Sequence, residues 1–238
     1  MQWSDEAIVL GARAHGETAA VAEIFTRSHG RHLGLVHGGR GRRARPVLQA
    51  GNHIDATWTA RLPEQLGHIA IELRAPYAAR SMADGASLAG LQSLTALLRL
   101  LPERDPHPAL FEVSLFVLGF LDDPSVWPAL MVRWEVALLE DLGFGLDLGQ
   151  CAATGGNDDL VYVSPKSGRA VSASAGAPYA DRLLRLPGFL VKGREAVLMP
   201  GDVAAGFALT GYFLETRVLA PRGLAMPEAR GRLVDLVG

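Results

Sequence analysis

Apolar and polar positions alternate along the first third of the chain, and glycines separate the alternating segments. In His53–Thr59, the side chains of Ile54, Ala56 and Trp58 fall on one face and polar side chains on the other. Alternation with a period of two is typical of half-buried antiparallel strands. The predicted strands are Ala7–Leu10, which opens after an acidic start, the candidates Val21–Thr26 and His32–His37, and the two alternating segments His53–Thr59 and Gly67–Arg74.

The last of these segments has the same pattern, with Ile69, Ile71 and Leu73 predicted to face inward. Its polar positions, His68 and Glu72, are predicted to face outward. Five short strands within one small region are typical of a closed barrel, and the five-stranded OB-fold is the favoured architecture. An SH3-like barrel is the competing architecture.

The hydrophobic period then changes from that of strands to that of helices. Leucines recur at helical spacing from Leu88 to Leu101, and two further apolar stripes follow, Phe111–Leu118 and Trp127–Leu142. Gly143 is placed to end the third helix. Three amphipathic helices with short turns predict a helical bundle. The change of period places the boundary near residues 76–81, which gives domains of residues 1–79 and 80–238.

Beyond the third helix the chain is rich in Gly, Ser and Asp from residue 146 to 176, with one short predicted strand, Leu160–Val163. A last helix is predicted over Gly201–Val218. The fold class is therefore α+β, with an N-terminal barrel followed by a helical domain.

Composition limits the classes of function. Hydrophobic residues make up 49% and charged residues 20% of the 238 positions, which is enough apolar material for a packed core. The formal net charge is −2, so any nucleic-acid surface must come from uneven placement of charge. We see no secretory signal and no apolar run of bilayer length, and the single cysteine suits a reducing compartment. A cytoplasmic location is expected.

One stretch departs from the charge balance of the rest of the chain. Residues 27–45 hold six arginines and no acidic residue, and glycines at 38, 39 and 41 suggest a flexible basic loop between two strands. Guanidinium groups pair well with phosphate, and basic grooves on OB-folds bind single strands. The predicted DNA-binding residues are Arg27, Arg31, Arg40, Arg42, Arg43 and Arg45. The nearest aromatic residues, Phe25 and Trp58, are expected in the core, so binding should be electrostatic and tolerant of sequence.

The sequence gives no sign of catalysis. The glycines at 38–41 lack the Gly-Lys-Ser/Thr of a phosphate-binding loop, and no helical pattern follows them directly. Cys151 has no Cys/His signature around it, and one cysteine cannot make a structural zinc site. No metalloprotease or serine-hydrolase motif occurs. We expect no enzyme activity, no cofactor and no metal.

The order of segments resembles the RecO family of recombination mediators. The segments that carry the resemblance are Ile8–Leu10, His15–Glu17, Phe25–Arg27 with Gly30, the Gly38-Gly39 basic loop, Trp134–Phe144 leading to Cys151, Tyr162–Ser172, Leu209–Leu214 and Leu224–Arg230. Together they span nearly the whole chain, although no single motif is decisive.

The resemblance implies an N-terminal OB-fold, a helical domain and a zinc-ribbon-like insert. It also implies binding of single-stranded DNA, annealing of complementary strands and loading of recombinase onto DNA coated with single-strand-binding protein. The implied partners are DNA, double-stranded as well as single-stranded, a RecR-like protein and the C-terminal tail of the single-strand-binding protein. The implied location is the cytoplasm, with nucleoid association during repair. The resemblance also implies that the predicted DNA-binding arginines occupy the region of the family's DNA contacts.

The chain departs from the zinc-binding members of that family, which have two Cys-x-x-Cys pairs. Here the first pair keeps Cys151 but has Thr154, and the region of the second, about Ser172 to Ala175, has no cysteine. We therefore expect a degenerate insert at residues 146–176 without zinc. A tight turn at Gly155, Gly156 and Asn157 is expected to hold the loop.

Four questions stay open at the level of sequence. The protein could be an interaction adaptor whose barrel is only structural, and distant carboxylates could converge into a nuclease site. DNA contacts could extend onto helical arginines, for which the candidates are Arg80, Arg99, Arg104 and Arg133. The position of a pocket for the tail of single-strand-binding protein is also not indicated.

Overall fold

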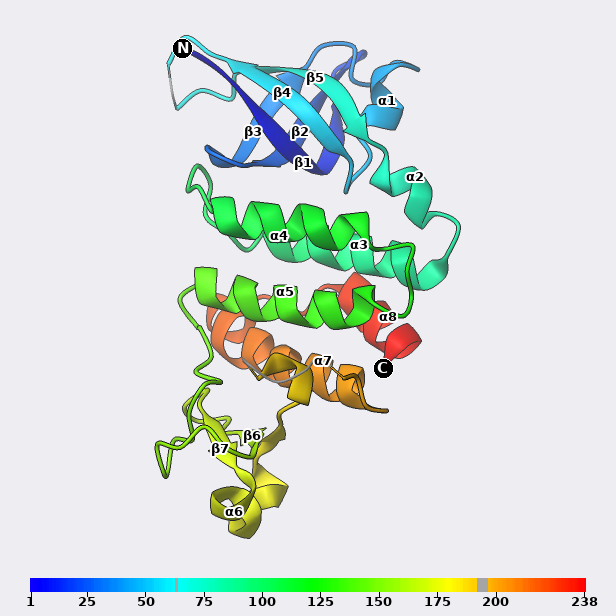
Figure 1. Cartoon of the computed structure of the whole chain (residues 1–238). Helices are drawn as coiled ribbons and strands as arrows, with labels where there is room; N and C mark the ends of the chain where they lie inside the picture. Colours follow the sequence, from blue (N-terminus) through cyan, green and yellow to red (C-terminus); the bar gives the residue numbers. More distant parts are fainter. Residues whose placement is uncertain (63, 192–196) are drawn as a thin grey trace. The chain divides into compact units, whose positions relative to one another are not determined.

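The computed structural model describes residues 1–62, 64–191 and 197–238, and it divides into two compact units, residues 1–124 and 125–238 (Figure 1). The first unit contains β1 (Gln2–His15), β2 (Ala19–Thr26), β3 (Gly30–Val36), α1 (Ala44–Val47), β4 (His53–Thr59), β5 (His68–Ala75), α2 (Tyr77–Ser81), α3 (Gly85–Leu98) and α4 (Pro108–Gly119). The second contains α5 (Trp127–Asp141), β6 (Leu160–Val163), β7 (Ala170–Ser172), α6 (Ala173–Gly176), η1 (Ala177–Arg182), β8 (Leu184–Arg185), η2 (Gly188–Leu190), α7 (Asp202–Phe213), η3 (Leu214–Leu219), η4 (Ala220–Arg222) and α8 (Glu228–Val237).

The five N-terminal strands close into a barrel in the order β1-β2-β3-β5-β4. The long strand β1 pairs with β4 through its first half and with β2 through its second half, and a register shift separates Val9 from Gly11. Such a bulge bends a strand, which lets one strand serve both sides of the barrel. The strand order and the parallel β3–β5 closure are those of an OB-fold, so the predicted fold is confirmed and the SH3-like alternative is wrong.

The predicted inward face of β4 is confirmed, because Ile54, Ala56 and Trp58 are all buried. On β5 the prediction holds only in part. Ile69 is buried, but the side chain of Leu73 is 39% exposed. The β4–β5 register shifts between His53 and Ile54, opposite Leu73, and the regular alternation ends there.

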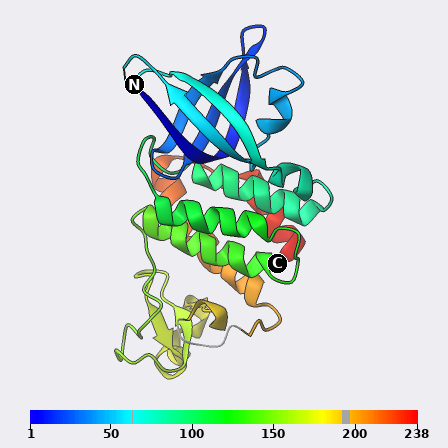
Figure 2. The same ribbon diagram turned by 45° about the horizontal axis from the view of Figure 1, so that its top comes forward.

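The strand β1 extends well beyond the predicted Ala7–Leu10. Its polar first residues pair with β4, and its last residues pair with β2 in a hairpin that reaches beyond the barrel on the side of α1 (Figure 2). Most positions at both ends of β1 are exposed or only partly buried, so the apolar pattern of the sequence does not extend to them. The extension matters for function because it forms one wall of the basic surface described below.

The three predicted helices are present as α3, α4 and α5. At the start of α3, Asp84 accepts a hydrogen bond from the backbone N–H of Ser87 at 2.7 Å. Gly143 ends α5 with φ +86°, as predicted, and the next backbone N–H, that of Phe144, bonds to the carbonyl of Leu139. The helices α3 and α4 belong to the first compact unit, and α5 belongs to the second.

The prediction of the last helix was wrong in one respect. The helix α7 and the π-helical segment η3 cover the predicted Gly201–Val218, but a further helix, α8, follows them. A buried ion pair explains why the apolar pattern missed it. Arg230 on α8 donates two hydrogen bonds to the carboxylate of Glu135 on α5, at 2.8 and 3.0 Å, and Thr210 on α7 donates a third. The inward face of α8 is thus partly charged.

The Gly/Ser/Asp-rich segment folds around a small sheet of order β7-β6-β8 within the second unit. The predicted strand Leu160–Val163 is confirmed as β6. The turn lies slightly earlier than expected, since the N–H of Cys151 bonds to the carbonyl of Gly156 and Gly155 takes φ +74°. In the part of the chain that the structure describes, no helix combines the length and the apolar character needed to cross a bilayer.

Candidate nucleic-acid interface

The basic segment after β3 is a turn that leads directly into the short helix α1, and not a loop without helix as the sequence suggested. Gly38 takes φ +63°, a conformation that favours glycine. Gly39 lies so close to β2 that a Cβ atom there would be 2.7 Å from the Cβ of Ala20. The two glycines therefore let the segment fold back against the barrel and hold α1 beside it.

Arg40 fixes this segment to the turn between β1 and β2. Its Nη1 donates hydrogen bonds to the carbonyls of Gly16, at 2.9 Å, and Glu17, at 2.8 Å, and its backbone N–H bonds to the carbonyl of Thr18. The guanidinium already has two acceptors from its own barrel. Arg40 therefore positions the basic segment as well as adding charge to it.

A groove separates α1 from the projecting β1–β2 hairpin. We call it the hairpin groove; its volume is about 420 Å³ and it is lined by Ala12, Arg13, Ala14, Ala20, Gly39, Arg40, Arg45, Leu48 and Gln49. Alanines with small side chains leave the space open, and three guanidiniums surround it. Arg13 was missed by the sequence analysis because the predicted first strand ended before it. The sequence did contain one sign of it, because Arg13 lies between two small residues, Ala12 and Ala14, in an alternating pattern that is typical of a strand.

A second groove lies on the other side of α1, where β3 and β5 close the barrel. Within the described residues a single partner pair, Leu35 and His68, joins these two strands. We call it the seam groove; its volume is about 440 Å³ and it is lined by Val36, His37, Arg43, Ala44, Val47, Thr57, Thr59, His68, Ile69, Ala70 and Ile71. The rings of His37 and His68 stack at its edge, with centroids 4.6 Å apart and planes 17° apart.

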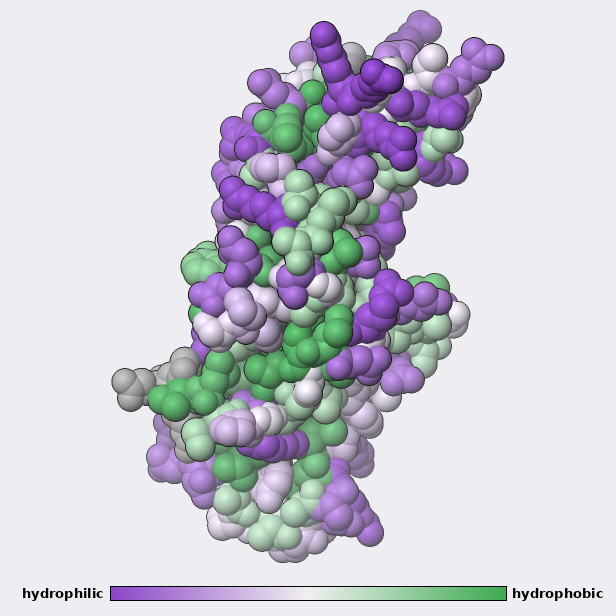
Figure 3. All heavy atoms as spheres, turned by 90° about the vertical axis from the view of Figure 1, so that its right-hand side faces the viewer, coloured by the Kyte–Doolittle hydropathy of each residue, from purple (hydrophilic) through white to green (hydrophobic). Residues whose placement is uncertain are grey.

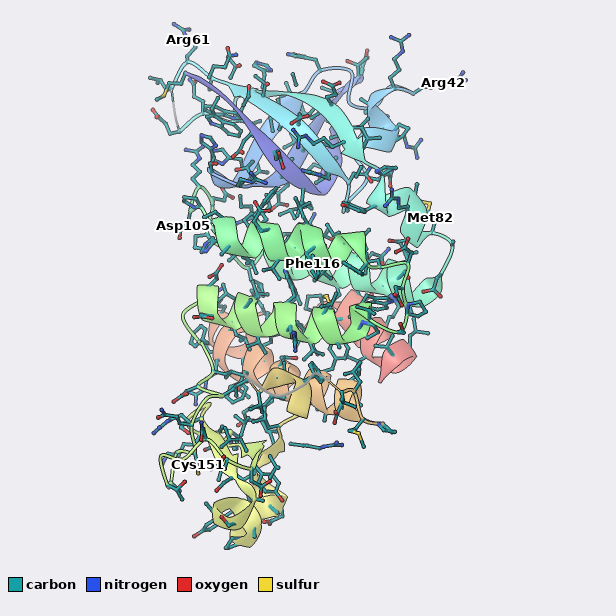
Figure 4. All side chains as sticks on the ribbon, in the orientation of Figure 1. Arg42, Arg61, Met82, Asp105, Phe116 and Cys151 are labelled. Carbon is teal, nitrogen blue, oxygen red and sulfur yellow. The ribbon has the colours of Figure 1, made fainter. Side chains whose placement is uncertain are left out.

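The arginines around α1 are exposed, and in the described chain Arg42, Arg43 and Arg45 form no ion pair with any acidic side chain. Arg42 extends away from the barrel into solvent (Figure 4). Hydrophilic side chains gather over the barrel on the side that carries α1 (Figure 3). Uncompensated guanidiniums on one side of a barrel create a local positive potential even though the net charge is −2.

The expectation that all six arginines share one loop was wrong, because Arg27 and Arg31 lie elsewhere and are paired. Arg27, after β2, forms ion pairs with Glu112, at 2.8 Å, and Glu6, at 3.3 Å. Arg31, on β3, pairs with Glu23 and donates to the carbonyl of Leu101 at 3.0 Å. The acidic partners come from outside the 27–45 window, so the window alone could not reveal them.

The helical arginines that the sequence left open also have contacts within their own units. The Nε of Arg99 lies 2.9 Å from the Glu23 carboxylate, and its Nη2 donates to the carbonyl of Leu10 at 2.8 Å. This links α3 to the outer face of the barrel. The other three contact a ring or a backbone carbonyl: Arg80 the ring of Tyr77, Arg104 the carbonyl of Gln65, and Arg133 the ring and carbonyl of Phe189.

Cys151, which the family resemblance assigns to the first of two cysteine pairs, lies in the second unit. Cys151 is buried, and its sulfur accepts a hydrogen bond from the backbone N–H of Ser172 at 3.3 Å. Burial raises the pKa of this thiol, but hydrogen bonds from Ser172 and Thr154 outweigh it and lower the pKa to about 6. The fold thus brings together Cys151 and Ser172, from the two regions that the family resemblance assigns to cysteine pairs. One thiol with two hydroxyl side chains does not fit a structural zinc site, which needs thiolate or imidazole ligands.

Comparison with known proteins covers almost the entire chain. Two family models match, "Recombination protein O N terminal" over residues 1–77 and "Recombination protein O C terminal" over residues 82–224. A protein of Methylobacterium nodulans named "DNA repair protein RecO" is 60% identical over 240 residues, which cover 99% of this chain and 98% of that protein. Proteins with the same name from Methylorubrum extorquens strain PA1 and Rhizobium etli strain CFN 42 are 58% and 54% identical. Those alignments each cover 99% of this chain, and 98% and 92% of the respective relatives.

Proposed function

The chain belongs to the RecO family of DNA repair proteins, and from this premise we propose that it is a non-enzymatic mediator of recombinational repair. In this role it binds single-stranded DNA through its barrel, anneals complementary strands and helps to load recombinase onto DNA coated with single-strand-binding protein. The observation that carries the proposal is the cluster of unpaired guanidiniums around α1 on an OB-fold.

The position of this cluster supports single-strand binding. OB-folds bind oligonucleotides through the loops after their first and fourth strands and the adjoining strand face. Here Arg40 is bonded to the β1–β2 turn, while His37 stacks on His68, the first residue after the β4–β5 loop. The basic segment therefore bridges the two loops that this fold uses for recognition. A strand laid along it would meet positive charge from one loop to the other.

The arginines have different roles in this proposal. Arg42, Arg43 and Arg45, with the newly placed Arg13, contact phosphates, and Arg40 contacts phosphate while it holds the segment in place. Arg27 and Arg31 lie in ion pairs with Glu112 and Glu23. Removing an acidic neighbour would expose their charge, but the native pairs leave them less available to DNA. We therefore assign those two primarily to the structure of the first unit.

The test is binding of a fluorescently labelled oligo-dT, followed by anisotropy in buffer of moderate salt. Replacing Arg42, Arg43 and Arg45 together with alanine should weaken binding at least about tenfold, because three phosphate contacts are lost. The melting temperature should stay unchanged, since all three side chains are exposed.

A matched control removes the same charge elsewhere. The variant R182A+R222A+R232A replaces three exposed arginines of the second unit and should bind oligo-dT like the unmodified protein. If both triple variants lose the same affinity for oligo-dT, the loss reflects only the change in net charge, and a site at α1 is refuted. Unchanged affinity in the α1 variant would refute it too.

The partners in this proposal are a RecR-like protein and the C-terminal tail of single-strand-binding protein. They follow from the family alone. The cytoplasmic location and the association with the nucleoid belong to the same proposal, as does binding to double-stranded DNA.

A second candidate function, an adaptor without strong DNA binding of its own, is favoured by a different observation. Val113 and Phe116 on α4, with Phe120 just after it, form an exposed apolar stripe. Phe116, labelled in Figure 4, is 53% exposed, and its ring lies 4.8 Å from that of Phe120. Exposed apolar patches are typical of protein-binding surfaces. A pull-down with the acidic, apolar tail peptide of single-strand-binding protein separates the two functions. Capture of the tail by a protein with no affinity for oligo-dT would favour the adaptor.

A further inference from the structure

The seam groove has a composition different from that of the hairpin groove. Its interior wall is apolar, with Ala44 and Val47 from α1 and Ile69 and Ile71 from β5. Its volume of about 440 Å³ falls within the range of roughly 300–1,000 Å³ that holds small organic groups. Charge alone would attract phosphates, but an apolar wall beside the charge suits a flat, weakly polar group.

The stacked histidines supply a surface for such a group. His37 and His68 are both exposed, and their rings are nearly parallel. A stacked pair of rings leaves an outer π-face on each ring, on which a further planar ring can stack. Histidine is one of the side chains on which proteins stack unpaired bases. Arg43 also lines this groove, and its guanidinium can hold a neighbouring phosphate.

The aromatic residues that lie nearest the basic segment in the sequence do not offer such a surface. Phe25 is fully buried against Phe111 of α4, and Trp58 is 2% exposed and donates its indole N–H to the carbonyl of Leu66. Both side chains are therefore part of the core, as predicted from the sequence. The histidine pair has the opposite character, since it lies on the surface, next to the β4–β5 loop and the basic segment.

We propose that the seam groove is a base-binding subsite, in which an unpaired nucleobase stacks on the His37–His68 pair while Arg43 holds the adjacent phosphate. The proposal rests on the proposed function and adds to it a contact with the bases. It replaces the expectation that binding is purely electrostatic. Stacking is tolerant of sequence because every base has a π-face, so the subsite suits a protein that anneals arbitrary strands.

The experiment compares two labelled oligonucleotides of equal length and equal charge, oligo-dT and an abasic deoxyribose-phosphate strand. The unmodified protein should bind oligo-dT about tenfold more tightly, which is the size of one stacking contact. The variant H37A+H68A should lose this preference while keeping the affinity of the unmodified protein for the abasic strand. The variant H37F+H68F should restore the preference, because phenylalanine keeps a stacking face.

His15 provides the matched control, since it is an exposed histidine at the end of β1 beside the basic turn. The H15A variant should keep the full preference for bases. The melting temperatures of all variants show whether the fold is intact. The variant H37F+H68F shows whether a lost preference for bases comes from the missing rings or from some other effect of the alanine substitutions.

The outcomes distinguish the subsite from the function on which it rests. If the unmodified protein binds neither strand, the proposed function fails and the subsite fails with it. If it binds both strands equally, or if H37A+H68A keeps the preference for bases, DNA binding stands and the stacking subsite is refuted.

Discussion

Arg31 and Arg43 belong to the same basic stretch, but their surroundings give them different roles. Arg31 is held by Glu23 and by the carbonyl of Leu101, whereas Arg43 lies exposed in the seam groove. The Arg31–Glu23 ion pair is partly buried, with each side chain 17% exposed, and a guanidinium paired in this way has less free charge to offer a phosphate. The presence or absence of an acidic partner therefore decides which arginines of residues 27–45 are free to contact DNA. The sequence shows the arginines but not the acids that come from distant strands and helices.

His32 gives a prediction at the same scale. Its ring is buried edge-on against Trp3, at 5.1 Å, and Trp58, at 5.9 Å. Burial, together with the nearby charge of Arg104, lowers its pKa from 6.5 to about 4. The unfolded chain thus takes up the proton at a higher pH than the folded chain, and protonation favours unfolding.

Stability should therefore be full above pH 6.5 and should fall as the pH drops from 6.5 to 4, by about 2–3 kcal/mol from this residue. Urea unfolding of the protein and of His32→Phe at pH 7.5, 5.5 and 4.5 measures the effect. The stability difference between the two proteins should shift in favour of the variant as the pH falls. Parallel pH profiles would show that His32 does not titrate in this window.

At the scale of elements, the sequence predicts the strands and helices whose apolar residues recur in a regular pattern. All five strands follow from short apolar runs or from alternation, and the helices α3, α4 and α5 follow from apolar residues at helical spacing. It fails where a tertiary contact replaces that pattern. The full length of β1 depends on pairing with two different strands, and α8 buries a charge in place of an apolar side chain.

The site follows the same rule as the fold. The basic segment is visible in the sequence as a cluster, but Arg13 becomes part of it only when the β1–β2 hairpin folds over α1. His37 and His68 are distant in sequence, and only the closure of β3 against β5 places one ring on the other. Contacts between segments of distant sequence carry no local signal.

The buried pair of Glu135 and Arg230 gives a prediction for the helices of the second unit. Glu135 is 0% exposed, and Arg230 also donates to the carbonyl of Phe207 at 2.8 Å. Arg230→Met leaves a buried carboxylate without its counter-ion and should lower the free energy of unfolding by about 3–5 kcal/mol.

Thermal or urea unfolding measures this loss. Arg232→Met, an exposed position on the same helix, is the matched control and should change stability by less than about 0.5 kcal/mol. The double variant E135L+R230M should recover much of the loss, because it removes the buried charge as well as its partner. A single Arg230→Met variant as stable as the control would contradict the role given to this pair.

For the whole molecule, the distribution of charge matters more than its sum. The chain has 25 acidic and 23 basic residues other than histidine, so it is slightly acidic, and bulk attraction to DNA is not expected. The proposed binding instead rests on the few guanidiniums around α1 that no acidic side chain neutralises in the described chain. Such binding has a measurable signature, because each phosphate neutralised on a single strand releases counter-ions.

The salt dependence of oligo-dT binding therefore tests the central claim most directly. The logarithm of the binding constant should fall with the logarithm of the salt concentration, by about 0.7 for each phosphate contact. The variant R42A+R43A+R45A should have a slope shallower by about 2, while R182A+R222A+R232A should keep the slope of the unmodified protein. Identical slopes for all three proteins would contradict the assignment of the DNA-binding surface to the arginines around α1.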